Sequence, residues 1–248
     1  MIRPRQVAMA DFARQYIAHR GLFDNEQDHP ENTLSAFQRA VDAGYGIELD
    51  VRLTKDSQLV VAHDDDLRRI CGEDVEISDL TYDELSQSRV FGSSQAVPLF
   101  TQVLQVVDGL VPLIVEVKES NRTSETCQAT AEQLSHYRGR YCVESFDPRV
   151  LLWFRLHRRG VLRGQLSGGF HDGGNKLRNK ALGIMIFNKL TWPDFIAYEW
   201  QDADRGIVKF WRLVLRCSMV AWTVRSQADL DAARANFDVF IFDSFIPR

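Results

Sequence analysis

Residues 46–51 read GIELDV and combine a strand pattern with a pair of acidic side chains. The apolar residues alternate with Glu48 and Asp50, so the two carboxylates share one face of a strand, with Cα atoms roughly 6.5–7 Å apart. Carboxylates on a buried strand repel each other and lose hydration unless a cation or a proton compensates them. The stretch therefore predicts a buried strand that offers acidic ligands, with ordinary salt bridges as the alternative.

A second stretch, LIVEVKE at residues 113–119, repeats this arrangement. Glu116 and Lys118 share one face of the strand, and the valines take the other. If the two strands are neighbours, their acidic side chains supply three oxygen ligands, a set that suits Mg²⁺ or Ca²⁺. Zinc would more often recruit histidine or cysteine. The two stretches together indicate a site for one hard divalent cation.

Outside these stretches, short apolar runs alternate with amphipathic segments, which is the pattern of βα units around a parallel sheet. A TIM (β/α)8 barrel takes about 250 residues, close to the 248 of this chain. A doubly wound open sheet is the alternative, but no glycine-rich phosphate loop follows the first strand. The predicted strands are Tyr16–His19, Gly46–Val51, Leu113–Val117, Tyr141–Glu144, Leu162–Leu166, Phe195–Tyr198, Met219–Thr223 and Val239–Phe242.

Helices are expected between these strands. The segment 32–43 begins with a capping residue, Asn32, and places apolar side chains on one face; Gly44 then stands where a helix ends. Similar patterns predict helices at 124–137, 148–159, 206–216 and 226–237.

A polar segment at 64–98 interrupts the alternation. It follows an extra strand candidate, Leu59–Ala62, and predicts a small insertion after the second strand that walls a pocket. The stretch 168–189 predicts no element. Because no linker is recognisable, we expect one domain over residues 1–248.

The charge balance limits the class of partner. Thirty Lys and Arg stand against 34 Asp and Glu, a net charge of −4 that disfavours nucleic acid. A small anionic ligand remains compatible, because a cleft can be positive on an acidic protein. The four cysteines form no CxxC pair, and no segment has the apolar length of a membrane span or a signal peptide. We expect a cytoplasmic protein without integral membrane association; the oligomeric state is not indicated.

Two histidines stand at the ends of predicted strands. His19 is followed by Arg20 and Gly21, and His63 precedes three aspartates. In a barrel, the carboxyl ends of the strands build the active site. A solvated turn position is the alternative for each histidine. Close to a metal, however, two such groups suit general acid–base chemistry on a phosphoryl centre.

In this order and spacing, the motifs resemble the glycerophosphodiester phosphodiesterase family. The resemblance covers nearly the whole chain and is most specific in the N-terminal half. It is carried by His19-Arg20-Gly21, Pro30–Thr33, Glu48–Val51, Thr54–Asp56, Val61–Asp64 and Glu116–Lys118, and more weakly by Ser145–Pro148 and Trp222–Val224.

The resemblance implies a TIM barrel with a small insertion after the second strand, and an enzyme that hydrolyses glycerophosphodiesters to glycerol 3-phosphate and an alcohol. It favours one histidine as the base and the other as the acid. The implied site comprises a divalent metal on Glu48, Asp50 and Glu116, the catalytic histidines His19 (base) and His63 (acid), and the phosphate-contacting cations Arg20 and Lys118.

Two other functions remain open. A lysophospholipase D or a sphingomyelinase-D-like enzyme shares this constellation but needs room for an acyl chain, and the insertion has no long apolar loop. A non-catalytic phosphodiester-binding barrel would be expected to have lost a ligand or a histidine, and none is missing. Phe23, Phe146 and Trp222 are candidates for an apolar pocket wall, with core packing as the alternative.

Overall fold

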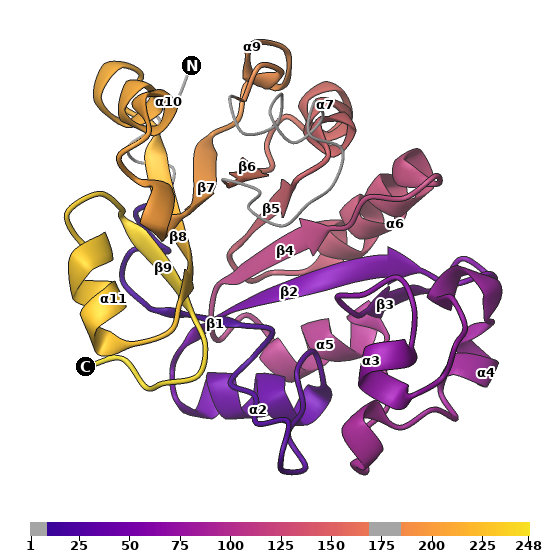
Figure 1. Cartoon of the computed structure of the whole chain (residues 1–248). Helices are drawn as coiled ribbons and strands as arrows, with labels where there is room; N and C mark the ends of the chain where they lie inside the picture. Colours follow the sequence, from indigo (N-terminus) through magenta and orange to yellow (C-terminus); the bar gives the residue numbers. More distant parts are fainter. Residues whose placement is uncertain (1–8, 169–184) are drawn as a thin grey trace. The chain divides into compact units, whose positions relative to one another are not determined.

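The computed structural model describes residues 9–168 and 185–248, which form two compact units. The central unit is Ala18–Tyr141, and the terminal unit comprises Met1–Ile17 and Cys142–Arg248. Strands and helices alternate along both (Figure 1). The expectation of one domain over the whole chain stays a prediction. Most of the stretch 168–189 lies outside the described residues.

The strands of the central unit put the acidic positions side by side. Strand β2 (Gly46–Leu53) pairs in parallel with β4 (Leu113–Val117) and antiparallel with β3 (Leu59–Val61). Asp50 is the register partner of Glu116. Because partners in neighbouring strands turn their side chains to the same face, this register brings the two acidic motifs together.

Three longer helices belong to the central unit: α2 (Leu34–Asp42), α5 (Phe100–Val107) and α6 (Thr123–His136). The cap of helix α2 lies one residue later than predicted, because Thr33, not Asn32, accepts the hydrogen bond from the Ala36 amide. Helix α5 is not among the predicted helices, although its buried residues Phe100, Val103, Leu104 and Val107 have the spacing of one face of a helix.

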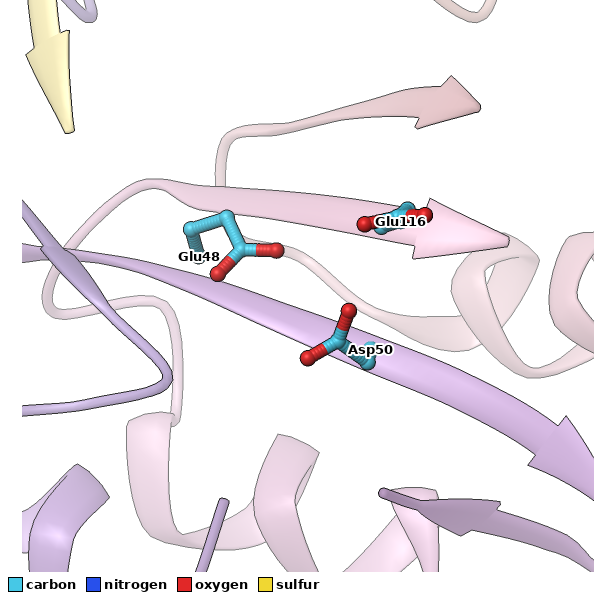
Figure 2. Close-up of side chains that lie close together, drawn as sticks. All are labelled: Glu48, Asp50 and Glu116. Atoms are coloured by element: carbon cyan, nitrogen blue, oxygen red, sulfur yellow. The ribbon is translucent and has the colours of Figure 1, made fainter. Parts of the chain in front are cut away.

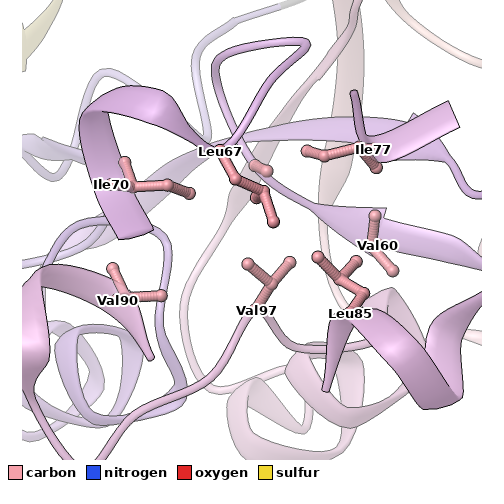
Figure 3. Packing of buried hydrophobic residues seen from close by; sticks show 8 residues of the cluster. Val60, Leu67, Ile70, Ile77, Leu85, Val90 and Val97 are labelled. Atoms are coloured by element: carbon pink, nitrogen blue, oxygen red, sulfur yellow. The ribbon is translucent and has the colours of Figure 1, made fainter. Parts of the chain in front are cut away.

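The predicted insertion follows β3 and has its own hydrophobic core (Figure 3). It contains two short helices, α3 (Arg68–Cys71) and α4 (Tyr82–Leu85), and two 3₁₀ turns, Ile77–Asp79 and Val90–Gly92. Helix α4 starts with a capping box between Thr81 and Glu84. The buried cluster that holds these pieces on β3 comprises Val60, Ala62, Leu67, Ile70, Ile77, Leu85, Val90 and Val97.

The terminal unit is a run of parallel strands in chain order, each paired with the next from β5 to β9. The strands are β5 (Tyr141–Ser145), β6 (Arg163–Ser167), β7 (Phe195–Glu199), β8 (Ser218–Val224) and β9 (Val239–Phe242). The helices in its described part are α7 (Pro148–His157), α9 (Asn188–Thr191), α10 (Gly206–Lys209) and α11 (Gln227–Ala233).

The helix predicted over 206–216 is shorter than expected. Helix α10 ends at Lys209, and Phe210–Val214 continue as a π turn. This turn buries Trp211 but leaves Leu213 and Val214 about two-thirds exposed, at 64% and 65%. The apolar pattern therefore overstates how much of this segment packs as a regular helix.

The described part of the chain has no helix long and apolar enough to cross a membrane. All four cysteines lie in the described ranges as free thiols.

Candidate active site

Three buried carboxylates meet between β2 and β4 (Figure 2). One oxygen each from Glu48, Asp50 and Glu116 lies within 4.8 Å of the others. Their exposed fractions are 3%, 1% and 7%. Such a cluster can hold a metal ion, and an all-oxygen ligand set suits a hard divalent cation.

The negative charge of these buried carboxylates is not fully compensated by the positive groups around them. Burial raises the pKa of Glu116 to about 7, although the nearby Lys118 ammonium opposes the shift. Burial also acts to raise the pKa of Asp50, but the charges around it, chiefly Lys118, hold that pKa well below its ordinary value. One carboxylate is thus poorly compensated by the protein alone, which is the condition that a bound cation relieves. The residues present fit a divalent ion.

Lys118, directly after β4, lies against two of the carboxylates. Its Nζ is 3.2 Å from Asp50 Oδ1 and 3.0 Å from Glu116 Oε1. Burial lowers the pKa of Lys118, but these two carboxylates raise it more, so the pKa lies above its ordinary value. The ammonium group therefore stays charged beside the cluster.

Arg20 reaches the same cluster from the turn after β1 (Ile17–His19). Its backbone N–H donates to Glu48 Oε2 at 3.2 Å, and its Nε lies 3.7 Å from Asp50 Oδ2. Its Nη1 donates to Glu31 Oε1 at 2.6 Å. These contacts hold a second permanent cation at the carboxylates.

Both histidines lie in the central unit. His19 Nε2 is 3.9 Å from Glu48 Oε2. His63 Nδ1 lies 2.7 Å from Asp64 Oδ1. Burial, followed by the charge of Lys118, lowers the pKa of His63 to about 4, so the ring is neutral near pH 7. Since the Asp64 carboxylate only accepts hydrogen bonds, Nδ1 carries the proton and Nε2 keeps its lone pair.

Comparison with known families identifies this arrangement. A family model described as the glycerophosphoryl diester phosphodiesterase family matches residues 19–162, which is more than half of the chain. The chain belongs to this family. The match begins at His19 and includes all three carboxylates, His63, and both cations.

Curated relatives of the glycerophosphoryl diester phosphodiesterase family match part of the chain. A glycerophosphodiester phosphodiesterase of Bacillus altitudinis is 35% identical over 149 residues, which are 55% of this chain and 60% of that protein. A human lysophospholipase D, GDPD1, is 35% identical over 123 residues, which are 44% of this chain and 38% of that protein. The matches thus span between about two-fifths and three-fifths of these relatives' length.

Solved structures match along almost the whole chain. A glycerophosphodiester phosphodiesterase of Thermotoga maritima has a TM-score of 0.71 at 26% identity, over 92% of this chain and 94% of that one. An Oleispira antarctica phosphodiesterase, solved with sn-glycerol-3-phosphate, has a TM-score of 0.75 at 21% identity, over 92% of both. The chain has the (β/α)8 barrel fold predicted from the sequence.

Two residues of the family motif at 30–33 do more than shape a loop. Asn32 Nδ2 donates to Asp50 Oδ2 at 2.9 Å. Glu31 accepts hydrogen bonds from Arg20 and from Arg69 of the insertion. The sequence predicted Asn32 as a helix cap, and it did not single out Arg69, whose charge is one among many in the insertion.

The three aromatic candidates for the pocket wall lie in different units. Phe146 and Trp222 are in the terminal unit, with ring centroids 5.6 Å apart in an edge-to-face contact. Phe23 is in the central unit and half-buried. Their role as a pocket wall stays a prediction.

Proposed function

We propose that this chain hydrolyses glycerophosphodiesters to glycerol 3-phosphate and an alcohol, with a divalent cation and two histidines. The observation that carries the proposal is the site of the central unit. It combines a buried cluster of three carboxylates with two histidines and two cations in one family fold. The net charge of −4 supports a small substrate rather than nucleic acid. The free thiols support a reducing compartment, such as the cytoplasm.

The charge of the site suits a phosphodiester with one negative charge. Three carboxylates outnumber the two cations, Arg20 and Lys118, by one. A divalent ion on Glu48, Asp50 and Glu116, Mg²⁺ or Ca²⁺, makes the site net positive and would polarise the phosphoryl group. Arg20 and Lys118 bind the non-bridging oxygens and offset the charge that develops on them.

The two histidines move the protons. One accepts a proton from the nucleophile, and the other donates a proton to the departing alkoxide. The resemblance assigns His19 as the base and His63 as the acid. With Nδ1–H donated to Asp64, the neutral His63 ring keeps its lone pair on Nε2, so Nε2 must take up a proton before His63 can donate one to the alkoxide. A polar group that holds the ring in one tautomer in this way supports a catalytic role.

Replacing either histidine tests this scheme. His19→Ala and His63→Ala are each expected to lower kcat by about 10²–10⁴, with the fold intact by circular dichroism. If His63 is the acid, hydrolysis of a p-nitrophenyl phosphodiester, whose leaving group needs no proton, suffers much less in His63→Ala than in His19→Ala. Near-normal turnover in either variant rules out the two-histidine scheme.

A polar cavity of about 270 Å³ lies beside Lys118. Its lining includes Arg52, whose Nε and Nη2 donate to the His63 carbonyl oxygen at 3.0 and 2.7 Å. Most of the other lining side chains are polar or charged, among them Asp65, Glu76 and Asn121, and two are apolar, Leu53 and Ile77. We place the leaving alcohol here. This size and polarity support a small hydrophilic headgroup rather than an acyl chain.

The second candidate is a lysophospholipase D, because human GDPD1 carries that name. The two candidates differ in the substrate, not in the carboxylates or histidines. A sphingomyelinase-D-like specificity would differ in the same way, and a non-catalytic barrel would show no turnover at all.

A product-coupled screen separates these functions. We expect glycerol 3-phosphate release from glycerophosphocholine and glycerophosphoethanolamine in the presence of Mg²⁺ or Ca²⁺. Choline release from lysophosphatidylcholine should be slower by far. Faster choline release from lysophosphatidylcholine establishes the lysophospholipase D alternative, and release from no diester contradicts the enzymatic assignment.

A further inference from the structure

We propose that Arg69, supplied by the insertion, is a positioning residue that fixes His63 and Arg20 together. The proposal rests on the proposed function, since it assigns Arg69 a task in that reaction. The polar segment 64–98 was predicted from its sequence to wall a pocket. The contacts of Arg69 indicate that the insertion also positions His63 and Arg20, which belong to different loops.

All three kinds of guanidinium nitrogen of Arg69 are engaged. Its Nε donates to Asp64 Oδ2 at 2.6 Å. Its Nη1 and Nη2 donate to Glu31 Oε2 and Oε1 at 2.9 and 2.7 Å, which is a two-pronged contact. One side chain thus ties the loop after β1 to the loop after β3.

Asp64 and Glu31, the two carboxylates that Arg69 contacts, each also contact a residue of the reaction centre. The other oxygen of Asp64, Oδ1, lies 2.7 Å from His63 Nδ1. Glu31 Oε1 accepts from Arg20 Nη1 at 2.6 Å. His63 and Arg20 therefore have a common anchor, and the chain of contacts runs from His63 through Asp64, Arg69 and Glu31 to Arg20.

The insertion core holds Arg69 in place. Its helix neighbour Ile70 and the preceding Leu67 are buried in the cluster of Figure 3, which fixes α3 on β3. Phe91 places its ring 5.8 Å from the Arg69 guanidinium carbon, as in a cation–π contact. The fork reaches Glu31 and Asp64 from a packed helix rather than from a free loop.

The geometry demands arginine rather than a positive charge alone. A lysine side chain has one nitrogen, so it cannot donate two parallel hydrogen bonds to Glu31 and a third to Asp64 in the geometry of the guanidinium group. Without the fork, Asp64 loses the contact that orients it toward His63, and Glu31 loses the contact that orients it toward Arg20. Small displacements of such groups cost activity because the reacting atoms must meet within tight limits.

The test compares Arg69→Gln and Arg69→Lys with Arg68→Gln as a matched control. Arg68 is on the same helix, and its side chain, 66% exposed, forms ion pairs with Asp66 and Asp74 at the surface. For Arg69→Gln we expect kcat on glycerophosphocholine to fall about ten- to a hundredfold. KM should rise as well, because Arg20 is less well held. Arg69→Lys should not restore kcat, and Arg68→Gln should behave as the wild type.

Two readouts separate positioning from general damage. In ¹⁵N spectra at pH 7, His63 should be an Nδ1–H tautomer in the wild type and in Arg68→Gln, and a mixture of tautomers in Arg69→Gln. The losses caused by Arg69→Gln and Asp64→Asn should not add in the double variant, since both break one chain of contacts. All variants are compared at equal folded fraction by circular dichroism.

The outcomes are distinguishable. An active wild type with Arg69→Gln indistinguishable from Arg68→Gln overturns this inference and leaves the proposed function standing. Full rescue by Arg69→Lys also overturns it, because charge alone would then suffice. A wild type that hydrolyses no diester contradicts the proposed function, whereas the tautomer comparison still tests whether Arg69 orients His63.

Discussion

Glu31 is a buried carboxylate held in its ionised form by two arginines. Burial acts to raise its pKa, but the hydrogen bonds from Arg69 and the charge of Arg20 lower the pKa by more, so that it lies at about 2. The ordinary value is 4.5. A carboxylate whose pKa is lower in the folded than in the unfolded state stabilises the fold above the unfolded value and loses this contribution as the pH falls.

Glu31→Gln is therefore expected to destabilise the protein in a pH-dependent way. At pH 7 the loss should be about 3 kcal/mol, because folding lowers the pKa of Glu31 from 4.5 to about 2. The gap to the wild type should narrow as the pH falls from 4.5 toward 2, where the wild-type carboxyl is also protonated. Urea unfolding at a series of pH values measures it. A gap that stays constant over this range would show that Glu31 is not held ionised by its partners.

The metal-cluster residues are the part of the site best predicted from the sequence. The alternation in β2 and β4 predicts the shared face of Glu48 and Asp50, and of Glu116 and Lys118, because a strand repeats every two residues. The contact between Glu31 and Arg69 has no such local signal. The two residues are 38 positions apart, and only the folded insertion brings them together.

At the level of elements, the turn after β1 depends on Gly21. Its φ is +84°, and a Cβ there would lie 2.9 Å from the backbone carbon of Ala36 in α2. The turn thus needs a residue that adopts positive φ and also lacks a side chain. This is why glycine follows Arg20 in the motif, and why the turn packs closely enough on α2 to aim Arg20 at the carboxylates.

Gly21→Ala should destabilise the protein by roughly 2–4 kcal/mol, the sum of backbone strain and a clash. Gly44→Ala is the matched control, since Gly44 also has positive φ, +73°, but nothing lies within 4 Å of a Cβ there. It should cost about 1 kcal/mol. Urea unfolding of both variants compares them. Equal losses would mean that backbone strain alone, and not the contact with Ala36, accounts for the glycine.

Strands were easier to predict than helices. Each predicted strand has its counterpart from β1 to β9, because buried parallel strands are short, nearly continuous apolar runs. The helical errors differ in origin. After α10 an apolar pattern continues as a π turn that leaves Leu213 and Val214 exposed, whereas α5 has a helical spacing of buried residues that the sequence analysis did not use.

At the scale of the whole molecule, the order of the motifs and the alternation of elements were enough to predict the (β/α)8 fold. They did not predict how the insertion acts on the site. Packing of the insertion core on β3 and the fork of Arg69 depend on side-chain geometry, which no periodicity in the sequence encodes.

The central claim is that the buried carboxylates support hydrolysis of a glycerophosphodiester through a divalent cation. The most direct measurement is glycerol 3-phosphate release by chelator-treated protein during titration with Mg²⁺ or Ca²⁺, with Asp50→Asn in parallel. Release should vanish on chelation, return with the cation in the wild type, and stay absent in Asp50→Asn. Wild-type release that is unaffected by chelation would contradict the claim.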